Sequence, residues 1–145
     1  MNIFFDTTVL VAASVQDHPH HAQALPAVRR AQHQQDKGFI SVHSIAEVYA
    51  TLTRLPVTPR IHPVEAQRIL VEDVLPYFEA VLIDLSDYVN ALSNIATNGW
   101  IGAKIYDALL LSCAAKCKAD RIYTFNLGDF RALASSEMLA KICAP

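Results

Sequence analysis

The feature that most constrains the fold is a series of short apolar runs, each followed by a segment with helical spacing. These runs fall at residues 3–5, 39–42, 80–85 and 121–125, with a smaller one at 141–143. Strands that alternate with helices form a mostly parallel sheet, because each right-handed crossover places a helix on one of its faces. We therefore expect a single α/β domain over residues 1–145, with a parallel central sheet of four to five strands sandwiched between helices.

The segments between these runs are expected to be helical, because their apolar residues recur every three or four positions. Pro26 interrupts the second segment, Gly38 is interpreted as a break before the second strand, and Ser86 is the expected cap of the fifth helix. The expected helices span residues 7–15, 17–35, 44–55, 63–76, 86–98, 105–118 and 126–134.

Composition excludes several classes of protein. With 52% hydrophobic residues and a net charge of -2, the chain is neither disordered nor broadly basic, so general attraction to duplex DNA is not expected. No apolar run approaches the roughly 18 residues of a membrane span. The first residues lack the basic region of an export signal, and the three cysteines do not suggest a disulfide framework. We expect a cytoplasmic protein without a membrane segment.

Four acidic residues stand out because they follow strands or begin buried helices: Asp6, Glu47, Asp107 and Asp129. Three of them have a structural alternative. Asp6 is a good helix cap, Ser44 with Glu47 matches a capping box, and Asn126 can cap a helix with Asp129 in its first turn.

A structural role explains Asp107 least well. The residues after it are almost all apolar, which is typical of a buried helix. The helix dipole favours a carboxylate there by only about 0.3–1 kcal/mol, less than the cost of burying an unpaired charge. Lys104, a metal ion or a proton could provide the compensation.

The carboxyl ends of parallel strands meet at one edge of a sheet, where ligands bind. Two like charges 4 Å apart repel by roughly 4 kcal/mol at an effective dielectric constant of 20, so four carboxylates need cations. Mg²⁺ or Mn²⁺ suits such oxygen ligands, and it supports the attack of water on a phosphodiester.

The site that these residues predict has three parts. Asp6 and Asp107 are the expected metal ligands, and Glu47 and Asp129 complete the catalytic set through water or as the base. The expected supporting shell consists of Thr124 and Asn126.

Segments 5–11, 44–52, 106–111 and 124–130 carry the four acids in an order that resembles the PIN-domain ribonucleases. Within that family the chain is most similar to the VapC-type toxins of toxin–antitoxin pairs. The resemblance runs from Ile3 to about Phe130 and is most specific in segments 47–56 and 124–130. Thr8 stands where the first motif of the family often has Asn.

The resemblance implies a parallel sheet between helices and a four-acid site for Mg²⁺ or Mn²⁺. It also implies cleavage of RNA, a homodimer, and inhibition by a small cognate antitoxin. We expect the segment 63–76 or its neighbours to supply the dimer contact. A stand-alone PIN nuclease and a PIN scaffold that only binds RNA or protein remain alternatives, which metal-dependent cleavage would separate.

Two other classes share part of the first motif. A haloacid-dehalogenase-like phosphatase would need Asp in place of Thr8, and a phospho-acceptor receiver domain would need an acidic residue in place of Thr7. A receiver domain would also need a lysine after the last strand, which the sequence does not supply.

Other polar residues are interpreted as structural. His18, His20 and His21 lack completing zinc ligands at motif spacing and are assigned to an exposed helix start. Asp84 is assigned to helix-start chemistry and Trp100 to partial burial in the core or a dimer contact. The candidate phosphate contacts are Arg29, Arg30, Arg54, Arg60, Arg68 and Lys104.

Overall fold

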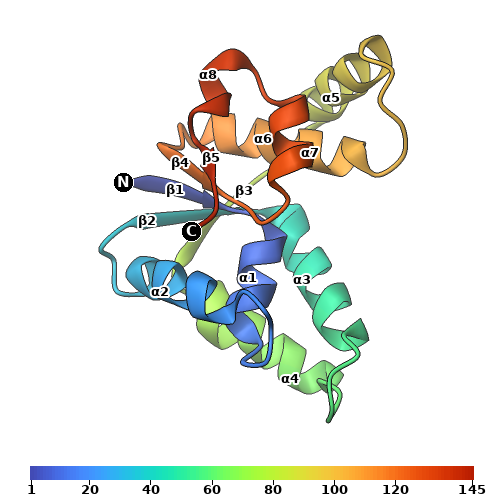
Figure 1. The fold of residues 1–145 in the computed structure, drawn as a ribbon. Coiled ribbons are helices and arrows are strands. Elements are labelled where there is room, and N and C mark those ends of the chain that lie inside the picture. Colours follow the sequence, from blue (N-terminus) through green and yellow to red (C-terminus); the bar gives the residue numbers. More distant parts are fainter.

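Five parallel strands form one sheet in the order β3-β2-β1-β4-β5 (Figure 1). The computed structural model describes residues 1–145. The strands are β1 (Asn2–Phe5), β2 (Lys37–Ser41), β3 (Phe78–Val81), β4 (Arg121–Tyr123) and β5 (Ile142–Cys143). The predicted parallel sheet is confirmed, and so is the small edge strand near the end of the chain.

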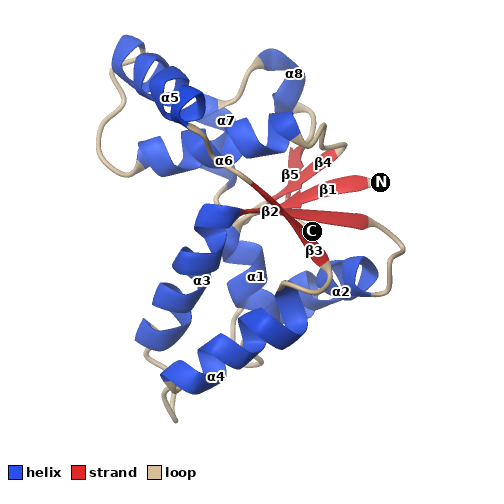
Figure 2. Ribbon diagram, turned by 180° about the vertical axis from the view of Figure 1, so that it is seen from behind, coloured by secondary structure: helices blue, strands red, loops and turns tan.

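The helices cover both faces of this sheet (Figure 2). One layer contains α1 (Thr7–Ser14), α2 (His21–Gln32), α3 (Val42–Arg54), α4 (Pro63–Arg68) and the π-helical η1 (Ile69–Val74). The other contains α5 (Leu85–Thr97), α6 (Lys104–Lys116), α7 (Leu127–Leu133) and α8 (Ser136–Leu139). None of these helices is both long and apolar enough to span a membrane.

Alternation of side chains along β1 divides the core in two. Ile3 and Phe5 pack with the layer of α1 to η1, whereas Phe4 packs with the layer of α5 to α7. Successive side chains of a strand point to opposite faces, so a strand covered on both faces is apolar throughout. Full burial of each phenylalanine contributes roughly 1.5–3 kcal/mol, which fixes the end of β1 and the residue after it.

The second helix and second strand differ from their predicted limits. α2 begins at His21 because residues 16–20 form turns, and it continues through Pro26 at the cost of one backbone hydrogen bond. Gly38 lies within β2 and is not a break. A Cβ at Gly38 would lie 2.6 Å from the ring of Phe78, so glycine allows that ring to pack against the strand.

The third strand and the helical segments before and after it also differ from the prediction. β3 ends at Val81, and the predicted helix 63–76 is α4 followed by η1. Asp84, in place of Ser86, caps α5 by accepting from the amide of Asp87, whose side chain accepts from the amide of Asp84 in return. Lys116 Nζ contacts both carboxylates, at 3.1 and 2.7 Å. The structural role predicted for Asp84 is confirmed.

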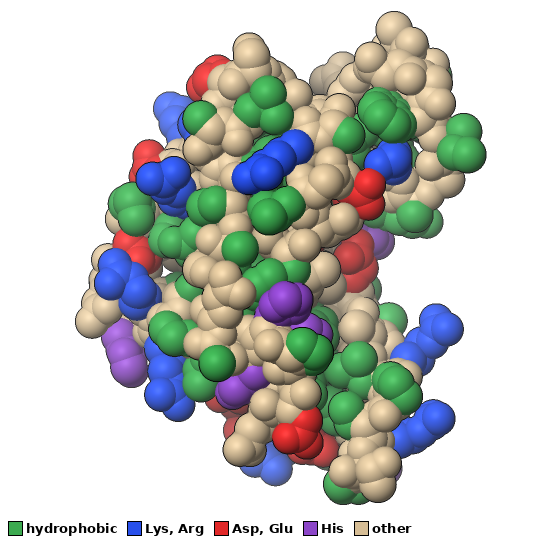
Figure 3. All heavy atoms as spheres, in the orientation of Figure 1, with side chains coloured by type: hydrophobic (Ala, Val, Ile, Leu, Met, Phe, Trp, Pro, Cys, Tyr) green, Lys and Arg blue, Asp and Glu red, His purple; other side chains and the backbone are tan.

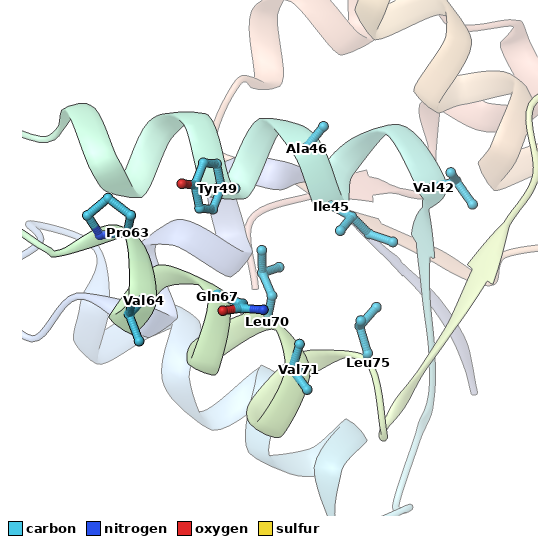
Figure 4. A pocket seen from close by; sticks show the side chains of 10 residues that line it. All are labelled: Val42, Ile45, Ala46, Tyr49, Pro63, Val64, Gln67, Leu70, Val71 and Leu75. Carbon is cyan, nitrogen blue, oxygen red and sulfur yellow. The ribbon is translucent and has the colours of Figure 1, made fainter.

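An apolar groove separates α3 from the α4–η1 segment (Figure 4). Tyr49 of α3 lines it on one side and Val64 and Val71 line it on the other, and the groove has a volume of about 690 Å³. All three side chains are 40–56% exposed. Exposed apolar surface gathered in one groove is typical of a protein contact.

Candidate active site

The four predicted acids lie at the carboxyl edge of the sheet, each held by a different element. Asp6 follows β1, Glu47 lies in α3, Asp107 in the first turn of α6 and Asp129 in the first turn of α7. Glu47, Asp107 and Asp129 line a cleft of about 770 Å³. Figure 3 shows acidic and histidine side chains in a hollow between the surface over α3 and the surface over α6 and α7.

Asp6 is the most deeply buried of the four, with 3% of its surface exposed. Its Oδ2 accepts hydrogen bonds from Thr8 Oγ1 at 2.6 Å and Thr124 Oγ1 at 2.8 Å. It occupies the N-cap position of α1 but makes no capping hydrogen bond there, so the helix-cap alternative is not supported. Burial raises the pKa of Asp6, and the two hydroxyl donors only partly oppose this rise.

Asp107 receives the repulsion of the whole cluster. Burial, followed by the charges of Asp6, Asp129 and Glu47, raises its pKa to about 6. Lys104 lowers the pKa of Asp107. It does not form an ion pair with Asp107, because its ammonium group contacts Asp129. The site therefore contains negative charge that its own cations do not neutralise.

Glu47 is fixed at both oxygens by residues of two helices. Thr7 Oγ1 donates to Oε2 at 2.9 Å, and His43 Nε2 lies 2.8 Å from Oε1. The predicted capping box is wrong because α3 begins at Val42, capped by the Ser41 hydroxyl. Ser44 lies inside the helix with its hydroxyl buried and without a hydrogen-bond partner.

Asp129 forms an ion pair with Lys104, the lysine of the site. Lys104 Nζ lies 2.5 Å from its Oδ1 and 4.8 Å from the centre of the Trp100 ring. The hydrogen bonds of Lys104 and Asn126 lower the pKa of Asp129. Asn126 makes no capping hydrogen bond to α7, so the capping interpretation is not supported here either.

The two supporting residues link the acids. The Asn126 amide N–H donates to Thr124 Oγ1 at 2.9 Å, and its Nδ2 lies 3.4 Å from Asp107 Oδ2. Thr124 in turn donates to Asp6. This chain of contacts couples the two expected metal ligands across the end of β4.

The donor set fits a hydrated magnesium or manganese ion better than a closed protein cage. No group of three His, Cys, Asp or Glu side chains is arranged to hold a metal ion by itself. Mg²⁺ characteristically retains several waters and uses only one or two carboxylates. Asp6 and Asp107 provide such oxygens, and a cation would stabilise the charged form of Asp107, which burial and the neighbouring acids disfavour.

The histidine cluster contacts the backbone and an aromatic ring. His21 Nδ1 lies 3.0 Å from the carbonyl of Ala12, and the His20 ring stacks on Phe125 with centroids 4.2 Å apart. The interpretation of this segment as the exposed start of a helix agrees with the exposure of His20 and the partial exposure of His18 and His21.

Sequence reasoning missed the two aromatic residues of the cleft, His43 and Tyr106. His43 lies one helical turn before Glu47, and Tyr106 directly precedes Asp107, so proximity to the acids was the available signal. Of the predicted phosphate contacts, only Arg54 and Lys104 line the cleft. Arg30 and Arg68 instead pair with Asp36 and Glu72.

Comparison with known proteins gives a consistent result. The model of the PIN domain family matches residues 3–135. Ribonuclease VapC40 of Mycobacterium tuberculosis is 31% identical over 134 residues, which cover 92% of this chain and 91% of that protein.

Solved structures share the fold at lower identity. The crystal structure of M. tuberculosis VapC20, described as a sarcin-ricin loop cleaving toxin, aligns with a TM-score of 0.69 at 20% identity, covering 93% of this chain and 97% of that one. VapBC2 from Rickettsia felis, bound to a DNA fragment from its promoter, aligns with a TM-score of 0.63 at 18% identity, covering 92% and 93%.

Proposed function

The chain belongs to the PIN-domain family, and from this membership we propose that it is a metal-dependent endoribonuclease, the toxin of a VapBC-type toxin–antitoxin pair. The observation that carries the proposal is the set of four acids at the carboxyl edge of the sheet, where burial and then the charges of the other three raise the pKa of Asp107. A relative that is named a ribonuclease and matches over nine-tenths of the chain supports the same activity.

In the proposed site Asp6 and Asp107 would hold Mg²⁺ or Mn²⁺. A bound ion of this kind polarises a phosphate oxygen and lowers the pKa of a bound water. Thr8 and Thr124 orient the carboxylate of Asp6. Glu47, whose two oxygens contact Thr7 and His43, would accept a proton from the attacking water.

The proposal is tested by Asp6→Asn and Asp107→Asn. Each removes one ligand charge while keeping the side-chain shape, and we expect RNA cleavage with Mg²⁺ or Mn²⁺ to fall by on the order of 10³-fold, because Lewis-acid stabilisation amounts to several kcal/mol. Glu137→Gln is the matched control, since its exposed carboxylate lies outside the cleft. Circular dichroism checks that each variant folds. Cleavage at wild-type rates in both site variants would refute the nuclease assignment.

We also propose that the chain forms a homodimer through the groove between α3 and the α4–η1 segment. A second copy would cover the exposed side chains of Val64 and Val71 by a two-fold contact. Val64→Asp and Val71→Asp should then convert a dimer to a monomer in light scattering. A single-chain mass for the wild type at micromolar concentration would contradict the dimer.

The cognate antitoxin, in this proposal, is a small protein encoded beside this chain, and both act in the cytoplasm. Co-expression of the neighbouring gene product should yield a complex that no longer cleaves RNA. Cleavage that persists in the presence of that product would favour a stand-alone nuclease.

A further inference from the structure

The cleft contains more than its acids require. Its volume of about 770 Å³ lies in the range of pockets that enclose a whole small molecule, far beyond one hydrated ion. The part of its lining that carries no acid includes Tyr106, His43, Ile101 and Arg54. These residues supply two aromatic rings, an aliphatic side chain and a cation, which together suit a nucleotide.

The two rings form a stacked pair across the cleft. Tyr106 of α6 and His43 of α3 have ring centroids 5.6 Å apart and planes within 15° of each other. Tyr106 is nevertheless 50% exposed, so much of its ring surface is available for a further contact. An aromatic ring that is already stacked on one partner and still exposed is suited to stack on a base.

Both rings of the Tyr106–His43 pair are directly connected to acids of the site. His43 contacts Glu47 through Nε2, and Thr7 holds the other oxygen of Glu47. Tyr106 is the residue immediately before Asp107 in α6. A base stacked on Tyr106 therefore belongs to the nucleotide next to the phosphate that the acids act upon.

Arg54 marks the direction in which the strand leaves. It lies seven residues after Glu47 on the same cleft-facing side of α3, which corresponds to about 10 Å along the helix. Arg54 is exposed and forms no ion pair within the chain. Its guanidinium is available for a phosphate further along the strand than the one beside Glu47.

We propose that Tyr106, supported by His43, is a base-stacking subsite for an unpaired nucleotide that flanks the cleaved phosphate, and that Arg54 contacts a phosphate beyond it. This inference rests on the proposed ribonuclease function and adds to it the residues that contact the nucleotides beside the cleaved phosphate. In a duplex the face of each base is covered by its neighbours, so a paired nucleotide cannot occupy this subsite.

The test uses an RNA oligonucleotide that spans a cleavage position mapped with the wild-type protein. Binding is measured by fluorescence anisotropy in the Asp6→Asn background with Mg²⁺, so that the RNA stays intact. Tyr106→Ala should weaken binding about 5- to 100-fold, which is the usual effect of removing one base-stacking ring. The affinity of Tyr106→Phe should stay within about twofold of the wild type. Tyr88 of α5 is a similarly exposed tyrosine, and Tyr88→Ala should have no effect.

Salt dependence separates stacking from charge. Arg54→Ala should lower the slope of log affinity against log salt by about 0.7, the value for one phosphate contact on a single strand, whereas Tyr106→Ala should leave the slope unchanged. Annealing a complementary strand over the oligonucleotide should weaken binding to the level of Tyr106→Ala or below.

Unchanged affinity in Tyr106→Ala, or equal affinity for the duplex, would overturn the subsite. Metal-dependent cleavage by the wild type, measured in parallel, keeps the two hypotheses distinct. If cleavage is present and Tyr106→Ala has no effect, only the subsite fails. If the wild type shows no metal-dependent cleavage of RNA, the proposed function fails and the subsite fails with it.

Discussion

Asp6 and Asp36 lie at opposite edges of the same sheet and are almost equally buried, at 3% and 6% exposure. Asp36 precedes β2 and meets two cations, Arg30 Nε at 2.8 Å and the Met1 ammonium at 3.1 Å. Asp6 follows β1 and forms no ion pair, and its carboxylate accepts from the hydroxyls of Thr8 and Thr124. Burial acts to raise the pKa of both groups, but the cations reverse this for Asp36 and lower its pKa.

The difference shows how this fold separates structural from functional acids. A carboxylate that only stabilises the edge of the sheet or caps a helix is paired with a cation. Arg30 pairs with Asp36, and Lys116 pairs with Asp84 and Asp87. At the opposite edge four acids share Lys104, and the pKa of Asp107 rises to about 6. This uncompensated charge lowers the stability of the protein alone and favours a bound cation.

The largest effect expected from this contrast is stabilisation by a divalent ion. An ion that binds only the folded state at a hundredfold excess over its dissociation constant stabilises by roughly 2.7 kcal/mol, or several degrees in melting temperature. Melting curves with Mn²⁺ and with chelator measure this shift. Asp36→Asn should retain it and Asp6→Asn should lose it. A wild type that melts identically with and without the ion would remove the metal site.

Replacement of Asp36, the acid that is paired with two cations, should have the next largest effect on stability. Asp36→Asn removes the charge from two charge-assisted hydrogen bonds of a buried carboxylate, so we expect the free energy of unfolding to fall by about 2 kcal/mol. Urea denaturation of the wild type and the variant gives this difference, with the exposed Glu137→Gln as control. A change below about 0.5 kcal/mol would show that burial of Asp36 does not depend on its cations.

Loss of an uncompensated acid should have the opposite sign. Asp107→Asn removes a repelling charge, and in the absence of metal at pH 7 we expect the free energy of unfolding to rise by about 1 kcal/mol, a value reduced for solvent screening because the side chain is partly exposed. The measurement is chemical denaturation in chelator. Destabilisation by this variant would mean that Asp107 stabilises α6 and that the repulsion is already relieved.

The smallest expected effect is a pH dependence of the stability that Asp107→Asn gains over the wild type. Because the pKa of Asp107 in the folded protein exceeds its value of about 3.9 in the unfolded chain, its contribution to stability is complete below pH 4 and is lost as pH rises through about 6. The difference between wild type and Asp107→Asn should therefore grow from pH 4 to pH 7, which isolates Asp107 from the histidines. The lowered pKa of Asp36 predicts the reverse, with stability lost only as pH falls below about 4.

The sequence by itself determined the parallel sheet, its two helical layers and the edge at which the four acids lie. These follow from local signals, because the period of apolar residues selects strand or helix, and parallel crossovers bring every strand end to one edge. The same signals misplaced helix starts where two candidate caps lie close together. Ser41 caps α3 instead of Ser44, and Asp84 caps α5 instead of Ser86.

Only the tertiary structure decided which acids have partners. Lys104 lies three residues before Asp107 in the sequence, yet it contacts Asp129, which is 25 residues away. Thr7 reaches Glu47 across 40 residues, and Tyr106 meets His43 from the opposite helical layer. Such pairings depend on how the helices pack over the sheet and how far each side chain reaches. Periodicity along the chain carries no information about either, so the charge balance of the site and its stacked rings emerge only in the folded protein.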